Sequence, residues 1–501
     1  MKDSAKKKLE EIFGRENVLD SMEDRIAYSY DGTPLISSLP QAAVIPSSPS
    51  SIGVEQISKL VRLANEENFS IVPRGSGTGL SGGSIPAENS VVILMARWDN
   101  VIEIDKSNLT AWVEPGVITG KFQSLVESQG LFYPPDPGSS QICTIGGNVA
   151  ENASGLRGLK YGVTKNYVLG LEVVLPTGEV MHVGGKNTKD VAGYNLKDVL
   201  IGSEGTLGIF TRILLRLLPL PQAGKTILAF YDSISKAAES VSAIAERRIM
   251  PAMLEFLDNP TIRAVEDFAH LGLDTECGAL LLIEVDGARS STEEDAAAIE
   301  EVCKKSGANN IKIAKDEAES IKLKAARKTA FAALARIRPT TILEDATVPR
   351  SELPVMVEFI NDSANKNNVQ IGTFGHAGDG NLHPTGLTDE RDRDEIRRTE
   401  KAFGEIFRKA FDLGGTITGE HGVGLAKKKF FEELYDTPFI RWMKQTKEML
   451  DPNCILNPGK IISVKPRCEG ALPKSREQIE RLLSKMSQRD TFGEIPPEVY
   501  F

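Results

Sequence analysis

The sequence predicts an α+β protein with more than one domain, and two observations carry that prediction. Short apolar runs of strand length alternate with amphipathic helical stretches, most regularly after residue 224. This alternation is typical of helices layered against a mostly antiparallel sheet. The chain also has 501 residues, which is too long for one ordinary hydrophobic core, so two or three domains are expected.

The composition argues against several classes of protein. Hydrophobic residues make up 41% and charged residues 26%, as in soluble globular proteins, and no apolar run approaches the length of a membrane span. The net charge of −10 argues against general nucleic-acid binding. The start, Met1 to Gly14, carries lysines without an apolar core, so it predicts an amphipathic helix and no secretory signal. Five scattered cysteines without a CxxC pair favour a reducing, cytoplasmic setting.

The first half begins with a strand, a helix and a strand, predicted at 42–46, 52–64 and 69–72. A glycine-rich segment follows, P-R-G-S-G-T-G-L-S-G-G, Pro73 to Gly83. It contains G-x-G-x-x-G, but a Rossmann loop must open a helix, and here another strand is predicted at 91–95. The segment therefore predicts a loop whose bare amides approach an anion such as pyrophosphate, with Arg74 adding positive charge. A flexible loop without a ligand is the alternative.

Two further segments are rich in glycine and small hydroxyl residues, Pro134 to Gly155 and Gly202 to Ile209. One ligand that touches three separated loops must be long, and a dinucleotide meets that requirement. Around these loops, strands are predicted at 101–104, 110–113, 167–175 and 179–183, and a helix at 118–128.

The second half follows a predicted boundary at Pro219 to Gly224. Its long helix at Ile321 to Ile337 carries Arg327 and Lys328 midway, and such charges either lie in solvent or serve a site. Strands are predicted at 226–231, 252–256, 279–285 and 311–314, and a last helix near 437–450.

Three of the five histidines fall between positions 376 and 421, beside an acid and many glycines. His376 and His383 lie in G-H-A-G-D-G-N-L-H, which predicts two strands joined by a tight turn. With Glu420 they form a two-histidine, one-carboxylate set that suits a divalent metal with an open position. Neighbours in extended chain point to opposite sides, so His421 is predicted to face away from the metal and stay free as a base. Histidines that simply satisfy turns are the alternative.

The loop segments carry a resemblance. P-R-G-S-G-T-G-L-S-G-G, P-P-D-P-G-S-S with I-G-G-N-V-A-E-N-A-S-G, and G-S-E-G-T-L-G-I resemble the FAD-binding domain of the vanillyl-alcohol oxidase/p-cresol methylhydroxylase superfamily. More narrowly, residues 25–462 resemble FAD-linked 2-hydroxy-acid dehydrogenases, the family of glycolate oxidase catalytic subunits and D-lactate dehydrogenases.

The resemblance implies three parts of the chain. Residues 1–220 would form a two-part FAD-binding domain with an N-terminal helical segment at about 1–40. Residues 221–425 would form an α+β substrate (cap) domain with an antiparallel sheet and the metal site. Residues 426–501 would be a C-terminal helical segment that returns to the FAD domain and ends in a tail, with a helix predicted at 476–486.

The same resemblance implies the residues that bind FAD. The first loops hold no histidine and Cys143 lies inside Q-I-C-T, so the FAD is expected to be non-covalent. The implied contacts are Arg74, Gly75, Ser76, Gly77, Thr78, Gly79, Pro137, Gly138, Ser139, Thr144, Gly147, Asn148, Ser154, Gly155, Tyr161, Gly162, Glu204, Gly205, Gly208, Ile209 and Asn457.

For the substrate site, the resemblance implies His376, His383 and Glu420 as ligands of a divalent metal. Zinc is expected, with iron and manganese as alternatives. His421 is implied as the catalytic base and Asn381 as a substrate contact. Arg327 stands where family members place the arginine that grips the substrate carboxylate, a task that suits a guanidinium fork.

The reaction expected from the resemblance is oxidation of a small D-2-hydroxy acid, with hydride passing to FAD. Phe331 and Leu343 stand where D-2-hydroxyglutarate dehydrogenases bind the distal carboxylate through threonine and lysine. D-lactate or glycolate is therefore favoured over D-2-hydroxyglutarate. The alternatives are a redox-neutral transferase of the alkyl-dihydroxyacetone-phosphate synthase type and a non-catalytic FAD subunit of a larger oxidase.

The expected partners are the hydroxy acid and an electron acceptor: electron-transfer flavoprotein, an iron–sulfur subunit or a quinone. A homodimer and attachment to a membrane through a partner protein are further options. The role of the tail after Lys465 stays open.

Overall fold

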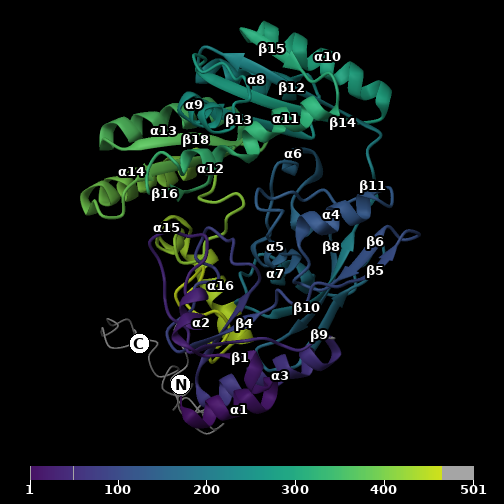
Figure 1. Cartoon of the computed structure of the whole chain (residues 1–501), viewed down its shortest axis with the longest axis vertical. Coiled ribbons are helices and arrows are strands. Elements are labelled where there is room, and N and C mark those ends of the chain that lie inside the picture. The colour runs from purple at the N-terminus through teal and green to yellow at the C-terminus, as the bar shows by residue number, and fades with distance from the viewer. Residues whose placement is uncertain (1, 49, 465–501) are drawn as a thin grey trace, which may run out of the picture.

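The computed structural model describes residues 2–48 and 50–464. Figure 1 shows the N-terminal part of the chain at the bottom and right and the middle part at the top. The last described helices, in yellow, lie back beside the N-terminal part. The helix predicted at 476–486 and the tail fall outside the described residues. The division of the chain into three domains stays a prediction.

The first sheet holds the strand that leads into the glycine-rich loop. Its order is β1-β2-β4-β3, and β2 and β3 both run parallel to β4. Helices α1 and α3 pack against it through residues such as Leu9 and Leu60. The elements are α1 (Asp3–Phe13), β1 (Val18–Leu19), α2 (Met22–Ala27), β2 (Ala42–Val44), α3 (Ser50–Glu67), β3 (Ser70–Arg74) and β4 (Ser90–Leu94).

The second sheet is antiparallel, in the order β5-β6-β10-β8-β9. Helices α4 and α5 cover it through residues such as Phe122 and Val149. The strands are β5 (Val101–Asp105), β6 (Thr110–Val113), β8 (Val168–Val174), β9 (Val180–Gly184) and β10 (Ile209–Arg216). The helices here are α4 (Thr119–Glu127), α5 (Ile145–Glu151), α6 (Gly158–Tyr161) and α7 (Leu196–Leu200), and β7 (Leu131–Phe132) pairs with β11 (Leu218–Pro219).

The third sheet is the largest, with eight strands in the order β15-β12-β14-β13-β18-β19-β16, and β17 beside β19. All its pairings are antiparallel, which confirms the predicted α+β layer. The strands are β12 (Ala223–Tyr231), β13 (Met253–Asp258), β14 (Ala279–Gly287), β15 (Asn310–Ile313), β16 (Thr340–Leu343), β17 (Ala346–Thr347), β18 (Gln370–His376) and β19 (Asn381–Thr388).

Helices cover both faces of this sheet, so two cores sandwich it. Leu254 and Phe256 of β13 enter one core, whereas Met253 and Leu257 enter the other, because successive side chains of a strand alternate. The first core holds α8 (Ile234–Glu246), α10 (Arg289–Lys305), α13 (Leu353–Asn367) and α14 (Arg393–Asp412). The second holds α9 (Asn259–Ala269), α11 (Glu317–Lys328) and α12 (Ala330–Leu334).

The single helix predicted at 321–337 is wrong, because the structure has two helices, α11 and α12, on either side of Thr329. The Thr329 hydroxyl donates a hydrogen bond of 2.8 Å to the carbonyl oxygen of Ala325. A hydroxyl bonded to the carbonyl four residues back competes with the helical hydrogen bond and bends the chain. The break leaves Arg327 and Lys328 in the last turn of α11.

After α15 (Lys428–Leu434) and α16 (Thr437–Leu450), the chain returns to the first sheet. Leu456 pairs with Ile71 of β3 in a parallel bridge. The amide of Ile71 donates to the oxygen of Ile455 over 2.7 Å, and the amide of Asn457 donates to the oxygen of Ile71 over 2.8 Å. Within the described residues, no helix combines the length and apolarity needed to cross a membrane.

Candidate active site

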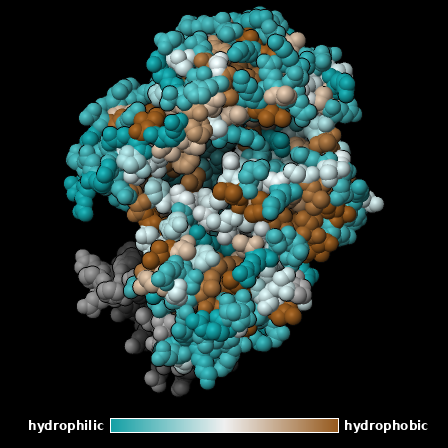
Figure 2. Space-filling view, viewed as in Figure 1, coloured by the Kyte–Doolittle hydropathy of each residue, from teal (hydrophilic) through white to brown (hydrophobic). Residues whose placement is uncertain are grey.

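A cavity of about 720 Å³ lies between the glycine-rich loops of the first two sheets and the third sheet. Figure 2 shows this side of the molecule hollowed between its upper and lower parts. One wall consists of loop residues from 73–84, 137–153 and 204–210. The other wall is made by Arg327, Lys328, Phe331, Ala332, Leu343, Phe374, His376, His383, Glu420 and His421.

The loop after β3 reaches β4 without a helix, so the prediction of a loop between strands is confirmed. A Cβ atom on Gly79 or Gly138 would meet nothing within 4 Å, so the bare backbone at these two positions faces open cavity. Gly155 is different, since its φ is +132° and a Cβ there would overlap the carbonyl oxygen of Asp136. A long ligand that binds through backbone amides fits such a wall.

Polar side chains of the loops are already tied into the fold. Arg74 is buried, and its Nη1 donates to the carbonyl oxygen of Tyr30 over 2.7 Å. Thr144 accepts from the amide of Gly147 over 3.2 Å and so caps α5. Asn148 donates over 2.7 Å to Thr119. The loops are therefore held in place by protein contacts.

Most of the predicted FAD contacts line the cavity, but five do not. Ser154, Gly155, Tyr161, Gly162 and Asn457 lie outside its wall. The Tyr161 hydroxyl instead donates to Asp286 of β14 over 2.7 Å. The side-chain nitrogen of Asn457, Nδ2, donates to the carbonyl oxygens of Gly83 and Glu204, each over 2.7 Å. Asn457 therefore links two loops.

The hairpin predicted for the histidines is present. β18 ends at His376, the turn Ala377–Asp379 follows, and β19 begins at Asn381. Glu420 arrives from the loop between α14 and α15. Its Oε1 lies 3.1 Å from Nε2 of His376 and 3.2 Å from Nε2 of His383. Among the described residues these three offer ligand atoms that all lie within 4.8 Å of one another.

The pKa values of this cluster are strongly shifted. Burial opposes ionisation of Glu420, but His376 and His383 hold its pKa well below the usual value. Burial also opposes charge on His376, yet Glu255 and Glu420 raise its pKa to about 10. Burial lowers the pKa of His383 to about 4. A carboxylate and a neutral imidazole are the forms that bind a divalent cation, so Glu420 and His383 already fit a metal. His376 would fit it on releasing the proton that it now shares with Glu420.

His421 lies beside the cluster. Its ring is stacked on that of His383, with the two ring centres 5.1 Å apart. Burial lowers its pKa. The predicted opposite orientation of Glu420 and His421 is wrong, because both side chains line the cavity. The cause is Asp345, whose Oδ2 accepts from the amides of Gly419, Glu420 and His421 over 2.7, 2.8 and 3.3 Å. These bonds curl the loop where an extended strand was expected.

Arg327 and Lys328 both line the cavity but differ in burial. Lys328 is exposed, whereas Arg327 is buried and its guanidinium lies 4.6 Å from the centre of the Phe374 ring. The Nε of Arg327 donates over 2.6 Å to Glu255. Asn381 is buried beside Gly419 and lies outside the cavity wall. Its role as a substrate contact stays a prediction.

Sequence reasoning missed two buried acids. Glu255 contacts both His376 and Arg327, and Asp345 pairs with the fully buried Lys427. The one signal for Glu255 was an acid inside the apolar strand M-L-E-F-L-D, since a fully buried acid needs a partner.

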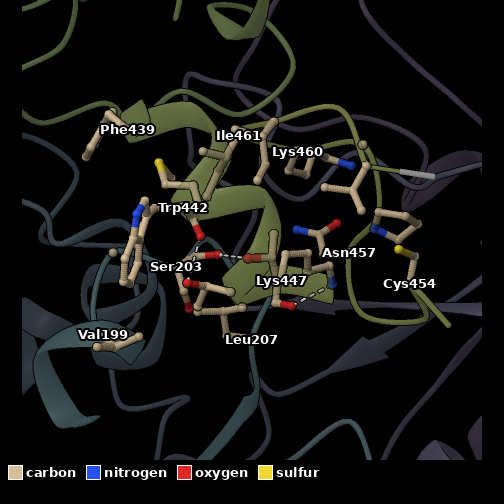
Figure 3. Close-up of a pocket in the computed structure, with 18 residues that line it drawn as sticks. Val199, Ser203, Leu207, Phe439, Trp442, Lys447, Cys454, Asn457, Lys460 and Ile461 are labelled. Carbon is tan, nitrogen blue, oxygen red and sulfur yellow. Dashed lines mark hydrogen bonds between the residues drawn. The ribbon is translucent and has the colours of Figure 1, made fainter. Parts of the chain in front are cut away.

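A second, smaller pocket of about 260 Å³ lies on the other side of the loop at 203–207. Figure 3 shows Val199, Phe439 and Trp442 along one side of it and Asn457 and Lys460 along the other. None of the His376, His383, Glu420 set lines it. The chemistry of the candidate site is therefore confined to the larger cavity.

Two family models match the chain. An FAD binding domain matches residues 40–184, and the C-terminal domain of FAD linked oxidases matches residues 220–461. The glycolate oxidase subunit GlcD of Bacillus subtilis strain 168 is 52% identical over 458 residues, covering 91% of this chain and 96% of that protein. A D-lactate dehydrogenase of Anaerostipes hadrus is 34% identical over 418 residues, covering 81% and 87%.

Solved structures share the fold at low identity. A substrate-bound p-cresol methylhydroxylase superposes with a TM-score of 0.76 at 18% identity, over 92% of this chain and 97% of that one. An alkyldihydroxyacetonephosphate synthase gives 0.70 at 20% identity, over 92% and 86%. Both likenesses show the fold alone, and the family itself is shown by the family models and the relatives.

Proposed function

Because the chain belongs to the family of FAD-linked oxidases and is an FAD-dependent oxidoreductase, we propose that it oxidises D-lactate or glycolate to the 2-oxo acid. The observation that carries the proposal is the single cavity that joins the glycine-rich loops to Arg327 and the histidine cluster. A relative named glycolate oxidase subunit and another named D-lactate dehydrogenase support this substrate class.

The FAD would lie along the glycine-rich wall, held without a covalent bond. Gly79 and Gly138 leave room there for a pyrophosphate against bare backbone, and Arg74 places a positive charge behind the same loop. Cys143 is buried, and burial raises the pKa of its thiol, so it is a poor nucleophile for a covalent flavin link. When bound, FAD supplies the acceptor for two electrons and a hydride.

A divalent metal, zinc first with iron or manganese as alternatives, would be held by His376, His383 and Glu420. Two imidazole nitrogens and one carboxylate oxygen already converge on one point. When bound, such a cation supplies a Lewis acid that lowers the pKa of a substrate hydroxyl.

The residues of the chain then have separate tasks. Arg327 would hold the substrate carboxylate and so fix the direction of the hydrogen on Cα. His421, with its lowered pKa, is a neutral base whose Nε2 would take the hydroxyl proton. Its Nδ1 lies 3.7 Å from Oδ1 of Asp345, so that carboxylate stabilises the imidazolium that forms.

The wall beside Arg327 favours a short substrate. Phe331, Leu343 and Phe374 line it and offer no charge to a second carboxylate, and the one further cation of this wall, Lys328, is exposed. D-2-hydroxyglutarate is therefore the less favoured substrate within the family. The transferase alternative shares the fold at 20% identity, whereas the FAD-linked oxidase model covers the third sheet as well. The non-catalytic alternative would not need the buried ligand set.

Reduced flavin must pass its electrons on, and electron-transfer flavoprotein, an iron–sulfur subunit or a quinone is proposed as acceptor. We also propose a cytoplasmic location, with a homodimer and attachment to a membrane through a partner protein as further options.

The test is the visible spectrum of the purified protein under anaerobic conditions. Addition of D-lactate or glycolate should bleach the flavin band, while L-lactate and D-2-hydroxyglutarate should do so far more slowly. Metal analysis of the same sample should find about one divalent ion per chain. A flavin band that no hydroxy acid bleaches would refute the proposed reaction.

A further inference from the structure

Glu255 joins two parts of the candidate site that are far apart in sequence. Its Oε1 lies 2.8 Å from Nδ1 of His376, and its Oε2 lies 2.6 Å from Nε of Arg327. The side chain is fully buried, in the middle of β13. One carboxylate therefore bonds a predicted metal ligand with one oxygen and the predicted substrate clamp with the other.

Each bond has a consequence for the group it holds. The Nδ1–H of His376 donates to Glu255, so Nε2 is the nitrogen that faces Glu420 and the metal position. It would offer its lone pair to a metal there after releasing its own proton. At Arg327 the bond uses Nε, so the two terminal nitrogens stay available for both oxygens of a carboxylate. Phe374 under the guanidinium keeps the plane of that fork fixed.

The charges of these buried side chains also connect the metal position with the substrate position. When His376 is neutral, as a metal ligand has to be, two carboxylates, Glu255 and Glu420, and one guanidinium leave this buried cluster with a net negative charge. A divalent cation together with one substrate carboxylate neutralises it, and buried charges are tolerated when they are paired. With the charge of Glu255, the cluster is neutral when the divalent cation and the substrate carboxylate are both bound.

We propose that Glu255 is a positioning residue that sets the affinity for the metal and for the substrate carboxylate together. The inference rests on the proposed function, since it needs a metal on His376 and a carboxylate on Arg327. A purely structural salt bridge would stabilise the fold without linking these two affinities.

The experiment compares Glu255→Gln with Asp258→Asn. Asp258 is the matched control, because it is a buried acid three positions on in the same strand, bonded to the amides of Thr261 and Thr373 outside the site. A glutamine at 255 accepts from only one of the two donors and turns an N–H toward the other. Two readouts need no turnover: the rate of metal loss to EDTA, and the dissociation constant of oxalate from flavin difference spectra.

Glu255→Gln should lose metal about tenfold faster or more, the size typical of the groups that orient metal ligands, and bind oxalate about tenfold more weakly. Its KM for D-lactate should rise more than its kcat falls. Asp258→Asn should match the wild type in both readouts, whatever its melting temperature. Should Glu255→Gln fail to fold, Glu255→Asp, which is too short to reach both partners, should weaken both affinities.

Three outcomes overturn the inference: neither affinity changes, only one changes, or Asp258→Asn changes both equally. These differ from failure of the proposed function. Wild-type protein that binds no metal, or whose flavin no hydroxy acid reduces, would refute that function directly, whereas a wild-type-like Glu255→Gln protein leaves it standing.

Discussion

The two walls of the cavity recognise their ligands by opposite means. The loop wall offers bare backbone, with Gly79 and Gly138 open to the cavity. The opposite wall offers charged side chains, since His376, His383 and Arg327 are buried and joined to Glu255 or Glu420. Ligand binding at the loop wall should be weakened by added side-chain atoms, whereas ligand binding at the charged wall should be weakened by removing or moving a charge. Substitutions of each kind should therefore separate cofactor binding from chemistry.

The largest effect is expected from Glu420→Gln. The change removes the charge from the atom on which both imidazoles converge, so bound metal and turnover should fall by at least about a hundredfold. FAD content should stay at the wild-type level, because the loop wall is untouched. Metal analysis, flavin absorbance and steady-state kinetics give the three values. The exposed Glu390→Gln is the control, and full metal in the Glu420 variant would end the metal assignment.

Arg327→Lys should come next, with kcat/KM reduced by about thirty- to a hundredfold. An ammonium cannot bond Glu255 and still present two parallel donors to a carboxylate. Lys322→Ala changes an exposed lysine of the same helix that lies outside the cavity wall, and it should alter kcat/KM by less than about threefold. Equal losses in the two variants would show that Arg327 has no special part in binding the substrate.

On the loop wall, Gly79→Val should weaken FAD binding by about tenfold or more, since its methyl groups enter the cavity where no protein atom stands. The melting temperature of the apoprotein should stay unchanged. Gly185→Val is the matched control, because a Cβ there also meets nothing within 4 Å and the residue lies outside the cavity wall. FAD affinity that is identical in the two variants would contradict the placement of the cofactor.

The smallest effect concerns the seam between the walls, where Glu204 accepts from the amides of Val423 and Gly424, each over 2.7 Å. Burial raises the pKa of Glu204 to about 7, so the folded protein keeps a proton that the unfolded chain has released. This contribution to stability is complete below the unfolded pKa and is lost as the pH rises through about 7. Urea unfolding between pH 5 and 8 should show a shallower decline for Glu204→Gln, and an unchanged slope would refute the assignment.

The loop wall and the histidine hairpin could be predicted from sequence because both are local. The loop from Pro73 and the hairpin of His376 and His383 each lie within about a dozen residues, and glycine marks their turns. The resemblance then supplied a role for Arg327, which no local pattern distinguishes from its solvated neighbour Lys328.

The contacts of Glu255 and Asp345 could not be predicted from the sequence, because their partners lie far away along the chain. Glu255 lies 121 positions from His376 and 72 from Arg327, and Asp345 lies 82 from Lys427. The antiparallel register of β13 with β18 brings Glu255 to His376, and the packing of α11 against the same face of the sheet brings Arg327 to Glu255. The curl of the loop at Glu420 could not be predicted for the same reason, since it is imposed by Asp345, which lies between β16 and β17 and 75 positions from Glu420.

The pairing of Leu456 with Ile71 has a consequence for biosynthesis. The strand that leads into the first glycine-rich loop leaves the ribosome before its last partner is made, because Leu456 follows Ile71 by 385 positions. Asn457, which ties the loops at Gly83 and Glu204, arrives at the same late moment. A nascent chain stalled before this segment would therefore lack the contacts that hold these loops together.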